Sequence, residues 1–175
     1  MRITGGHLKG YKISSGFPDH VRPTTDMMRE SLFNKLQHSC GIEDQKVLDL
    51  FSGSGIVSLE FLSRNAASVI SVDRDFKNIK IQNEIKSNLK IDNWQIQKSD
   101  VFSFIQKLEE KFDIIFADPP YDLKQMLQLP ELLIPKLAPD GILILEHRPG
   151  MAFHNAVETK KQGSSALSIF ANSIA

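Results

Sequence analysis

The sequence predicts an α/β fold, in which a mostly parallel sheet of seven strands carries helices on both faces. Two observations lead to this fold class. From residue 47 onward, short β-rich apolar runs alternate with longer amphipathic segments, which is the pattern of successive strand and helix units. In addition, four strand candidates have an aspartate at or near their carboxyl end, and the first is followed by a glycine-rich turn. Open α/β sheets bind ligands at this edge, so a binding crevice is expected there.

Five expected strands belong to the alternating part of the chain, and two more follow at its end. The five cover residues 46–51, 68–72, 94–97, 113–117 and 142–146. Near the C-terminal end, NAVET and ALSIF flank the segment KKQGSS, in which the lysines and Gly163 suit a turn. These last two strands are expected to form an antiparallel hairpin that closes the sheet.

Helices are expected between the strands, because apolar residues recur there at a spacing near 3.6. They cover residues 56–64, 76–89 and 101–108. A further helix is expected over residues 23–38, where Thr25 or Asp26 could cap the segment TTDMMRESLFNKL. Its apolar residues have the spacing of one helical face.

The first 22 residues depart from the alternation and are expected to form a small β-hairpin appendage around Gly5, Gly6 and Gly10. They carry an excess of three positive charges, with Asp19 as the one acid. The four cations are Arg2, Lys9, Lys12 and Arg22. A run of this size is a solvated surface as often as it is a phosphate-binding surface, so alone it does not decide between the two.

Length and composition indicate one domain, 1–175, in which the arm (1–22) and the N-terminal helix (23–38) precede the α/β core (46–175). The 21 basic and 21 acidic residues balance, so net charge identifies no partner. A single cysteine, Cys40, excludes an internal disulfide and fits a reducing compartment. No apolar segment is long enough for a signal peptide or a membrane span, so a cytoplasmic protein without a membrane partner is expected. The five histidines are scattered, and no metal site is expected.

The first strand-to-helix junction, DLFSGSG at residues 49–55, has the features of a ligand-binding turn. Gly53 and Gly55 allow a ligand to approach the backbone, and the start of the following helix offers unpaired N–H groups. Asp73 ends the second strand 20 residues beyond Gly53, where its carboxylate could accept both hydroxyl protons of a ribose. Asp100 and Asp118 follow the third and fourth strands.

A nicotinamide-dependent oxidoreductase is one alternative for this junction, but two features weigh against it. The pattern G-x-G-x-x-S lacks the third glycine of the dinucleotide fingerprint. Asp49 would also lie near the pyrophosphate, at a cost on the order of a kcal/mol or more. S-adenosylmethionine carries a sulfonium, an ammonium, a ribose and an adenine amino group but no phosphate. S-adenosylmethionine therefore fits the acids at the ends of these strands better than a dinucleotide does.

The fourth strand ends in Asp118, Pro119, Pro120 and Tyr121. Neither proline donates a backbone hydrogen bond, and each holds the residue before it in an extended conformation. The corner is therefore stiff, and it presents a carboxylate and an aromatic ring. Prolines and aspartates also occur in ordinary turns, so the corner alone does not establish a catalytic site.

Several motifs in order resemble a known family. DLFSGSG, the acid after the second strand, SDVF at 99–102 and DPPY at 118–121 resemble the amino-group branch of class I S-adenosylmethionine-dependent methyltransferases, which have a Rossmann-like fold. Within that branch, RITGGHLKG near the N-terminus and RPTTDMMRESLFN at 22–34 resemble the bacterial RsmD family of small-subunit ribosomal RNA guanine-N2 methyltransferases. The resemblance runs from residue 2 to about residue 147.

This resemblance implies roles for particular residues. Asp49, Phe51, Gly53 and Gly55 would contact the methionine part of the cofactor, and Asp73 its ribose. Asp100 and the Val101 amide would bind the adenine, with Thr24 and Glu30 bordering the pocket. Arg2, Lys9, Lys12 and Arg22 would bind phosphates of 16S ribosomal RNA, either free or in a small-subunit particle. The implied target is guanine 966.

The same resemblance gives the DPPY corner a chemical role. The lone pair of an exocyclic purine amine is delocalised into the ring, so the nitrogen must be held while it becomes pyramidal. Asp118 and the carbonyl of Pro119 could accept its two N–H bonds while the prolines, Pro120 included, keep these acceptors in place, and Tyr121 could stack on the base.

Two alternatives stay open. The same corner would serve an N6-adenine methyltransferase on DNA or RNA, and a non-catalytic RNA-binding protein could keep the fold. One motif also departs from the family, since Gln162, Gly163, Ser164 and Ser165 stand where it usually has a tyrosine-glycine-aspartate-threonine run.

Overall fold

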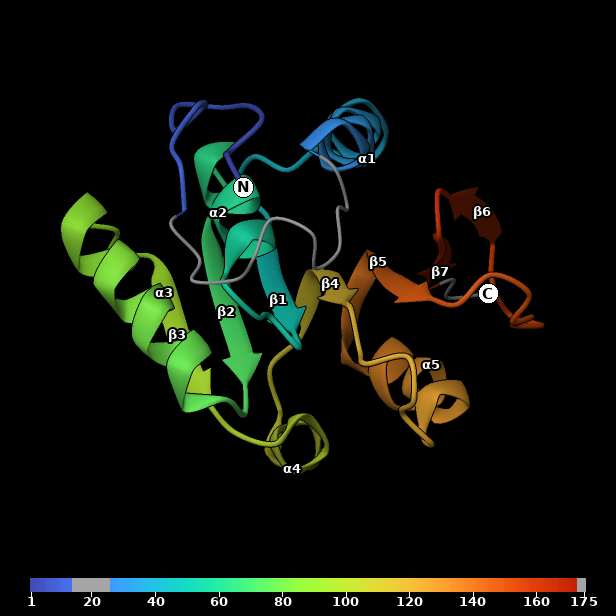
Figure 1. Cartoon of the computed structure of the whole chain (residues 1–175). Coiled ribbons are helices and arrows are strands. Elements are labelled where there is room, and N and C mark those ends of the chain that lie inside the picture. Colours follow the sequence, from blue (N-terminus) through green and yellow to red (C-terminus); the bar gives the residue numbers. More distant parts are fainter. Residues whose placement is uncertain (14–25, 173–175) are drawn as a thin grey trace.

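The computed structural model describes residues 1–13 and 26–172, which form a seven-stranded sheet with helices on both faces (Figure 1). The strands are β1 Lys46–Leu50, β2 Ser68–Asp73, β3 Trp94–Lys98, β4 Phe112–Ala117, β5 Leu137–His147, β6 Glu158–Gln162 and β7 Ser165–Ala171. The α-helices are α1 Asp26–Ser39, α2 Ile56–Ser63, α3 Phe76–Leu89, α4 Val101–Lys107 and α5 Leu129–Leu133, with single 3-10 turns at Met126–Gln128 and Ile134–Lys136. The predicted fold class is confirmed.

The strand order is β3-β2-β1-β4-β5-β7-β6, and among these strands every neighbouring pair is parallel except the two that involve β7. The order reverses direction between β1 and β4, which lie side by side in the centre of the sheet. In open α/β sheets, such a reversal leaves a crevice at the carboxyl ends of the strands. The predicted binding edge is therefore at the centre of this sheet.

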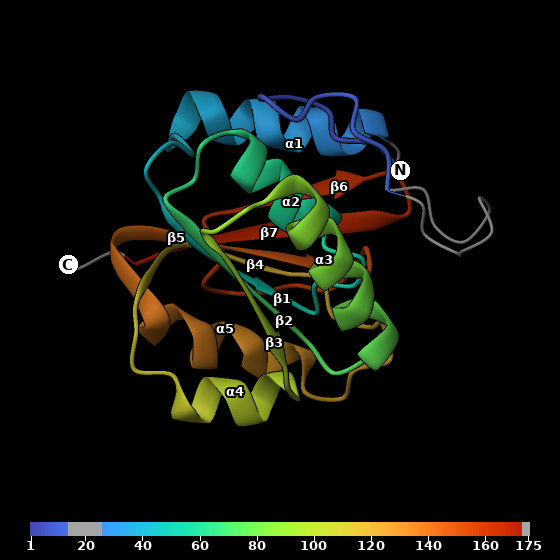
Figure 2. The same ribbon diagram turned by 90° about the vertical axis from the view of Figure 1, so that its left-hand side faces the viewer.

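Two apolar cores lie on opposite faces of the sheet. Helices α1, α2 and α3 cover one face, and α4 and α5 cover the other (Figure 2). Successive residues of a strand point to opposite faces, so Phe116 on β4 belongs to the first core and Ala117 to the second. The predicted core position of Trp94 is also confirmed, because its side chain is fully buried in the first core.

The N-terminal arm lies outside the sheet but is packed firmly onto α2. Within residues 1–13, one antiparallel bridge joins Arg2 and Lys12, and the side chains of Ile3 and Ile13 enter the first core. Gly6 has a φ of 75°, and a Cβ atom there would lie 1.8 Å from the Ser63 carbonyl oxygen. Glycine is therefore the residue that allows the arm to contact the end of α2.

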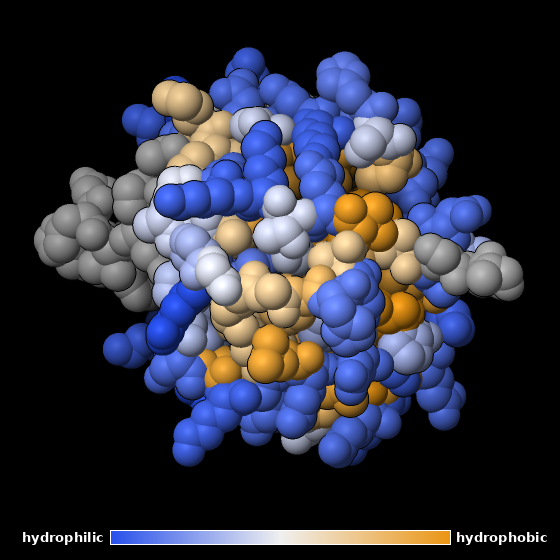
Figure 3. All heavy atoms as spheres, turned by 90° about the vertical axis from the view of Figure 1, so that its right-hand side faces the viewer, coloured by the Kyte–Doolittle hydropathy of each residue, from blue (hydrophilic) through white to orange (hydrophobic). Residues whose placement is uncertain are grey.

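The sheet ends at β6, an edge strand whose side chains are almost all exposed. Lys160 and Lys161 were expected in a turn, but they lie within this strand, which begins at Glu158 rather than at residue 155. Exposed lysines on an edge strand oppose pairing with a second chain. Hydrophilic side chains cover much of this side of the molecule, with smaller apolar areas between them (Figure 3).

Helix α5 and its flanking 3-10 turns have no counterpart in the predicted element list. They hold Pro130 and Pro135, and α5 is five residues long. A segment this short shows too little periodicity to predict a helix from sequence. No helix within the described parts of the chain is long and apolar enough to cross a membrane.

Candidate active site

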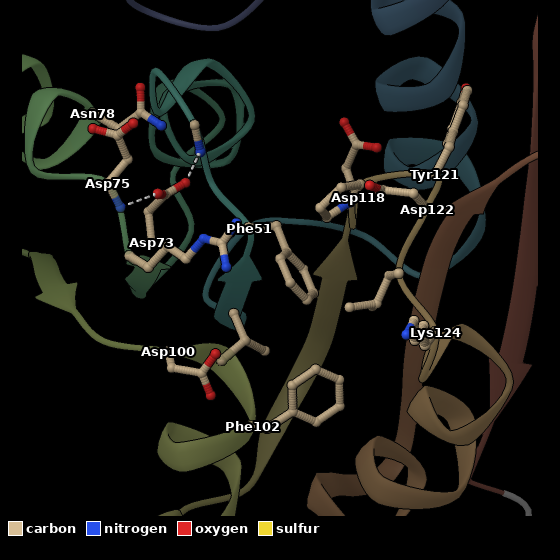
Figure 4. A pocket seen from close by; sticks show the side chains of 15 residues that line it. Phe51, Asp73, Asp75, Asn78, Asp100, Phe102, Asp118, Tyr121, Asp122 and Lys124 are labelled. Carbon is tan, nitrogen blue, oxygen red and sulfur yellow. Dashed lines mark hydrogen bonds between the residues drawn. The ribbon is translucent and has the colours of Figure 1, made fainter.

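A cavity of about 660 Å³ opens at the carboxyl ends of β1 to β4. We call it the first cavity, and it is lined by residues at or just after the end of each of these strands, including Phe51, Asp73, Asp100 and Asp118. Figure 4 shows Asp73 and Asp75 on one side, Asp118 and Tyr121 on the other, and Phe51 between them. Residues predicted from four separate strands thus meet in one crevice.

The loop between β1 and α2 has an unusual backbone. Phe51 has a φ of 58°, a left-handed conformation that is uncommon for a residue with a side chain, and Gly53 and Gly55 have φ values of 54° and 82°. A Cβ atom on Gly55 would lie 2.9 Å from atoms of both Gln82 and Trp94. Strained residues concentrate at ligand sites, and here they turn the loop sharply over the end of the sheet.

A buried polar network holds this loop from below. The Gln82 Nε2 atom donates to the Gly53 carbonyl at 2.7 Å and to the Ser52 hydroxyl at 2.9 Å. The Ser71 hydroxyl donates to Gln82 Oε1 at 2.6 Å and accepts from the Trp94 indole at 3.0 Å. Sequence reasoning missed Gln82, because it lies on the buried side of α3 without any local motif.

Asp73 and Asp100 both line the first cavity, and both also organise the backbone. The Asp73 carboxylate accepts from the Gly53 and Asp75 amides, each at 2.8 Å. Asp100 caps α4 by accepting from the Ser103 amide at 3.0 Å, and Val101 lines the first cavity beside it. Each carboxylate oxygen has two acceptor positions, so these bonds leave capacity for a ligand hydroxyl or amine.

Asp49 is fully buried beneath the loop and is not among the residues that line the first cavity. Its carboxylate accepts a hydrogen bond from the Ser58 hydroxyl at 2.5 Å. The pKa of Asp49 is raised to about 7, chiefly by burial; the hydrogen bond from Ser58 lowers it, and the nearby carboxylates of Asp118 and Asp73 add to the rise. A cation bound close by would favour the charged form of this group.

The DPPY corner follows β4 directly. The Asp118 amide donates to the Leu50 carbonyl at 3.4 Å, which ties the corner to the end of β1. Pro119 is buried, Pro120 is exposed, and both Pro120 and Tyr121 line the first cavity. The Arg148 guanidinium lies 5.9 Å from the centre of the Tyr121 ring, within the range of a cation–π contact.

A second cavity, of about 350 Å³, lies on the other side of Asp118. Its walls include the apolar side chains of Ile56, Val57, Phe116 and Leu167, and Asp118 and Glu146 bring carboxylates to it. Asp118, Gly53 and Asn78 line both cavities. Glu146 was not predicted as a site residue, although the run ILILE shows an acid at the end of β5 in the same pattern as the other strands.

The remaining predicted site residues lie apart from the crevice or outside the described residues. Thr24 and Arg22 lie outside the described residues. Glu30 is exposed on α1 and lines neither cavity, and Lys9 and Lys12 are exposed on the arm. Arg2 is exposed too, and its side chain pairs with Asp26 at 3.1 Å.

The charges around the first cavity suit a cationic ligand with a ribose. Five aspartates line it, against two basic side chains. The aspartates are residues 73, 75, 100, 118 and 122, and the basic residues are Arg74 and Lys124. This balance disfavours a pyrophosphate and fits a sulfonium and ammonium ligand. Among residues 1–13 and 26–172, no group of three or more acidic, histidine or cysteine side chains could hold a metal ion.

Fold and crevice together define a class I S-adenosylmethionine-dependent methyltransferase. Comparison with known proteins narrows this class. Residues 1–171 match the family described as conserved hypothetical protein 95. The ribosomal RNA small subunit methyltransferase D of Escherichia coli (strain K12) is 39% identical over 69% of this chain and 60% of its own length. The chain therefore belongs to the family described as conserved hypothetical protein 95, and the predicted resemblance to the RsmD methyltransferases is confirmed.

Two further relatives extend over more of the fold. YlbH of Bacillus subtilis (strain 168), provisionally assigned as an rRNA methyltransferase, is 36% identical over 84% of this chain and 82% of its own length. The solved structure of the E. coli protein yhhF, provisionally assigned as a methyltransferase, is 30% identical. It superposes with a TM-score of 0.85 over 98% of this chain and 97% of that one.

Proposed function

We propose that this protein transfers a methyl group from S-adenosylmethionine to the exocyclic N2 amine of a guanine in 16S ribosomal RNA, with guanine 966 as the expected position. The observation that carries the proposal is the position of Asp118. This first residue of the stiff DPPY corner lines both cavities. An acceptor group at that junction can hold an amine from the second cavity while it faces a donor in the first.

The cofactor would be bound by the residues of the first cavity. Asp73 would accept from the ribose hydroxyls, and Asp100 and the Val101 amide would bind the adenine. Phe51, Gly53 and Gly55 would pack against the methionine part, and the buried Asp49 would lie beneath it. Once bound, the cofactor supplies a methyl carbon made electrophilic by its sulfonium.

The corner would then act on the amine. Asp118 and the Pro119 carbonyl would accept its two N–H bonds, which holds the nitrogen as it becomes pyramidal and directs its lone pair toward the first cavity. The amine carries a surplus proton after the new carbon–nitrogen bond forms, and the Asp118 carboxylate is placed to accept it. Positioning and charge stabilisation of this kind lower a barrier by several kcal/mol.

RNA recognition would come from the arm and the corner. Tyr121 would stack on the unstacked base, a contact worth about 1 to 3 kcal/mol. Lys9, Lys12, Arg2 and Arg22 would contact phosphates. This class of substrate is supported by the names of two relatives, the ribosomal RNA small subunit methyltransferase D of E. coli and the provisionally assigned rRNA methyltransferase of B. subtilis.

The test is methylation of small subunits from a strain that lacks the enzyme, followed by nucleoside analysis. We expect N2-methylguanosine from the wild-type protein and a loss of about 100-fold or more in rate for Asp118→Ala. Asp92→Ala, which makes the same change in an exposed turn before β3, should keep full activity. N6-methyladenosine as the product would favour the adenine alternative. Full activity of Asp118→Ala would contradict the role of the corner, and no product from a folded wild-type protein would favour a binding function.

A further inference from the structure

Glu146 lies beside Asp118 at the carboxyl edge of the sheet. Strands β4 and β5 are parallel, with Phe116 paired to Ile144 and Ala117 to Leu145. The next residues in this register are Asp118 and Glu146. Since side chains alternate along a strand, both point to the face that carries Phe116 and Ile144, at a strand spacing of about 4.8 Å. Both line the second cavity, and the side chain of Glu146 is buried.

Strand order places Glu146 on the far side of Asp118 from the expected cofactor. The first cavity is lined from β1, β2, β3, β4 and the segment after β4, and no described residue of β5 lines it. Because β4 lies between β1 and β5, Asp118 separates the first cavity from Glu146. A group that touches Glu146 while its amine touches Asp118 would therefore be the substrate base.

The chemistry of the two carboxylates selects among bases. Guanine presents three N–H donors along one edge, two on N2 and one on N1, whereas adenine presents two on N6 and an acceptor at N1. A carboxylate only accepts hydrogen bonds, so a second acid next to the amine-binding acid matches guanine and repels the N1 lone pair of adenine. The apolar walls formed by Ile56, Val57 and Phe116 suit the faces of a planar base.

We propose that Glu146 selects guanine by accepting the N1–H bond, while Asp118 holds the neighbouring N2 amine. This inference rests on the proposed function and specifies how its substrate is recognised. The same hydrogen bond draws the N1 proton away from the ring and so raises electron density on N2. Glu146 thus contributes to both the choice of base and the reactivity of the amine.

The test compares guanine with 2-aminopurine, which keeps the N2 amine but has an acceptor at N1. Small-subunit particles are assembled from 16S ribosomal RNA that carries either base at the mapped target, and kcat/KM is measured for each. The wild-type protein is expected to prefer guanine. Glu146→Gln can turn its amide to donate to N1 of 2-aminopurine, so we expect the preference to fall by about tenfold or more. A merely structural role would lower both rates together and leave their ratio unchanged.

Two further variants keep the test decisive. Glu146→Asp retains the charge on a shorter side chain, so it should react more slowly but keep the preference for guanine. Glu131→Gln makes the same chemical change on the exposed surface of α5 and should leave both rates unaltered. Melting temperatures identify any variant that fails to fold.

Each outcome separates this role from the proposed function. An unchanged guanine preference in folded Glu146→Gln, with N2-methylguanosine still the wild-type product, would overturn the role of Glu146 alone. N6-methyladenosine from the wild-type protein would overturn both. Calorimetry with S-adenosylmethionine should give the same affinity for Glu146→Gln as for wild type. A clear loss would place Glu146 against the cofactor ammonium and overturn the assignment to guanine.

Discussion

At the scale of single residues, the buried Asp49 links folding to cofactor binding. Its carboxyl group does not line the first cavity, and its pKa is raised to about 7, chiefly by burial. In the unfolded chain it ionises near 3.8. The folded protein therefore holds this proton over a pH range in which the unfolded chain has released it.

The sign of the resulting pH dependence follows from this difference. The contribution of Asp49 to the free energy of unfolding is fully present below pH 3.8 and is lost as the pH rises through about 7. Asp49→Asn removes the charge and keeps an acceptor for Ser58. We expect this variant to be more stable than wild type at pH 8, by on the order of a few kcal/mol, with the gap closing toward pH 5. Urea unfolding at several pH values measures it.

The control for this experiment is Asp92→Asn, an identical change in an exposed turn, which should leave the pH profile of the wild-type protein unaltered. A stability gap between Asp49→Asn and wild type that does not vary with pH would contradict the account. Because a bound cation would favour the ionised form, S-adenosylmethionine should also bind the wild-type protein more tightly at pH 8 than at pH 6.

Several site residues could be predicted because their signal is local. Asp73, Asp100 and Asp118 each lie at or shortly after the end of a strand, so the alternation of elements places them at one edge of the sheet. The positions of Gln82 and Glu146 in the site could not be predicted in this way, because they depend on how elements distant in sequence pack together. Gln82 reaches the loop at Gly53 only because α3 crosses below it, and the proximity of Glu146 to Asp118 depends on the register of β4 with β5.

At the scale of elements, α2 carries a buried charge cluster that fixes the arm. Glu60, on this helix, has no exposed surface and accepts from Arg29 at 2.9 Å and from the Thr4 amide at 2.9 Å. Arg64 forms an ion pair with the same carboxylate. The carboxylate thus joins α1, α2 and the arm.

We expect Glu60→Ala to lower the free energy of unfolding by about 3 to 5 kcal/mol, because it leaves the buried Arg64 without its carboxylate and Arg29 with Asp26 as its remaining ion-pair partner. Glu158→Ala is the matched control, since Glu158 pairs with Lys35 at 2.6 Å on the surface. Its loss should cost about 1 kcal/mol or less. Chemical denaturation of both variants measures the contrast, and equal costs would argue against a buried cluster that supports the arm.

Elements with strong periodicity were predicted closely, and those without it were not. The helix at 76–89 was predicted with the bounds of α3, because its apolar residues recur regularly over four turns. The predicted strand 155–159 ended three residues before β6 does, since Lys160 and Lys161 resemble turn residues in sequence although the edge of a sheet accepts them.

At the scale of the whole molecule, charge is balanced overall, so RNA binding should depend on a local surface. Lys9 and Lys12 are exposed on the arm, whose backbone is fixed to α2. We expect the double change Lys9→Gln and Lys12→Gln to weaken binding to small-subunit RNA. The slope of log affinity against log salt should fall by about 0.7 to 0.9 for each phosphate that the variant no longer neutralises.

Filter binding over a range of salt concentrations tests this expectation. Lys107→Gln with Lys111→Gln, at the far face of the sheet around the end of α4, is the control and should keep both the affinity and the slope of wild type. Calorimetry should give an unchanged affinity for S-adenosylmethionine in both double variants. Equal salt slopes for the two would assign the RNA-binding surface to another part of the molecule.

The position of α2 has one more consequence. This helix starts at the loop expected to hold the methyl donor and ends at Ser63, whose carbonyl and hydroxyl accept from the His7 and Leu8 amides of the arm. Its eight residues span about 12 Å. If the arm binds RNA as proposed, the length of this helix fixes the distance between the methyl donor and the RNA backbone that the arm would contact.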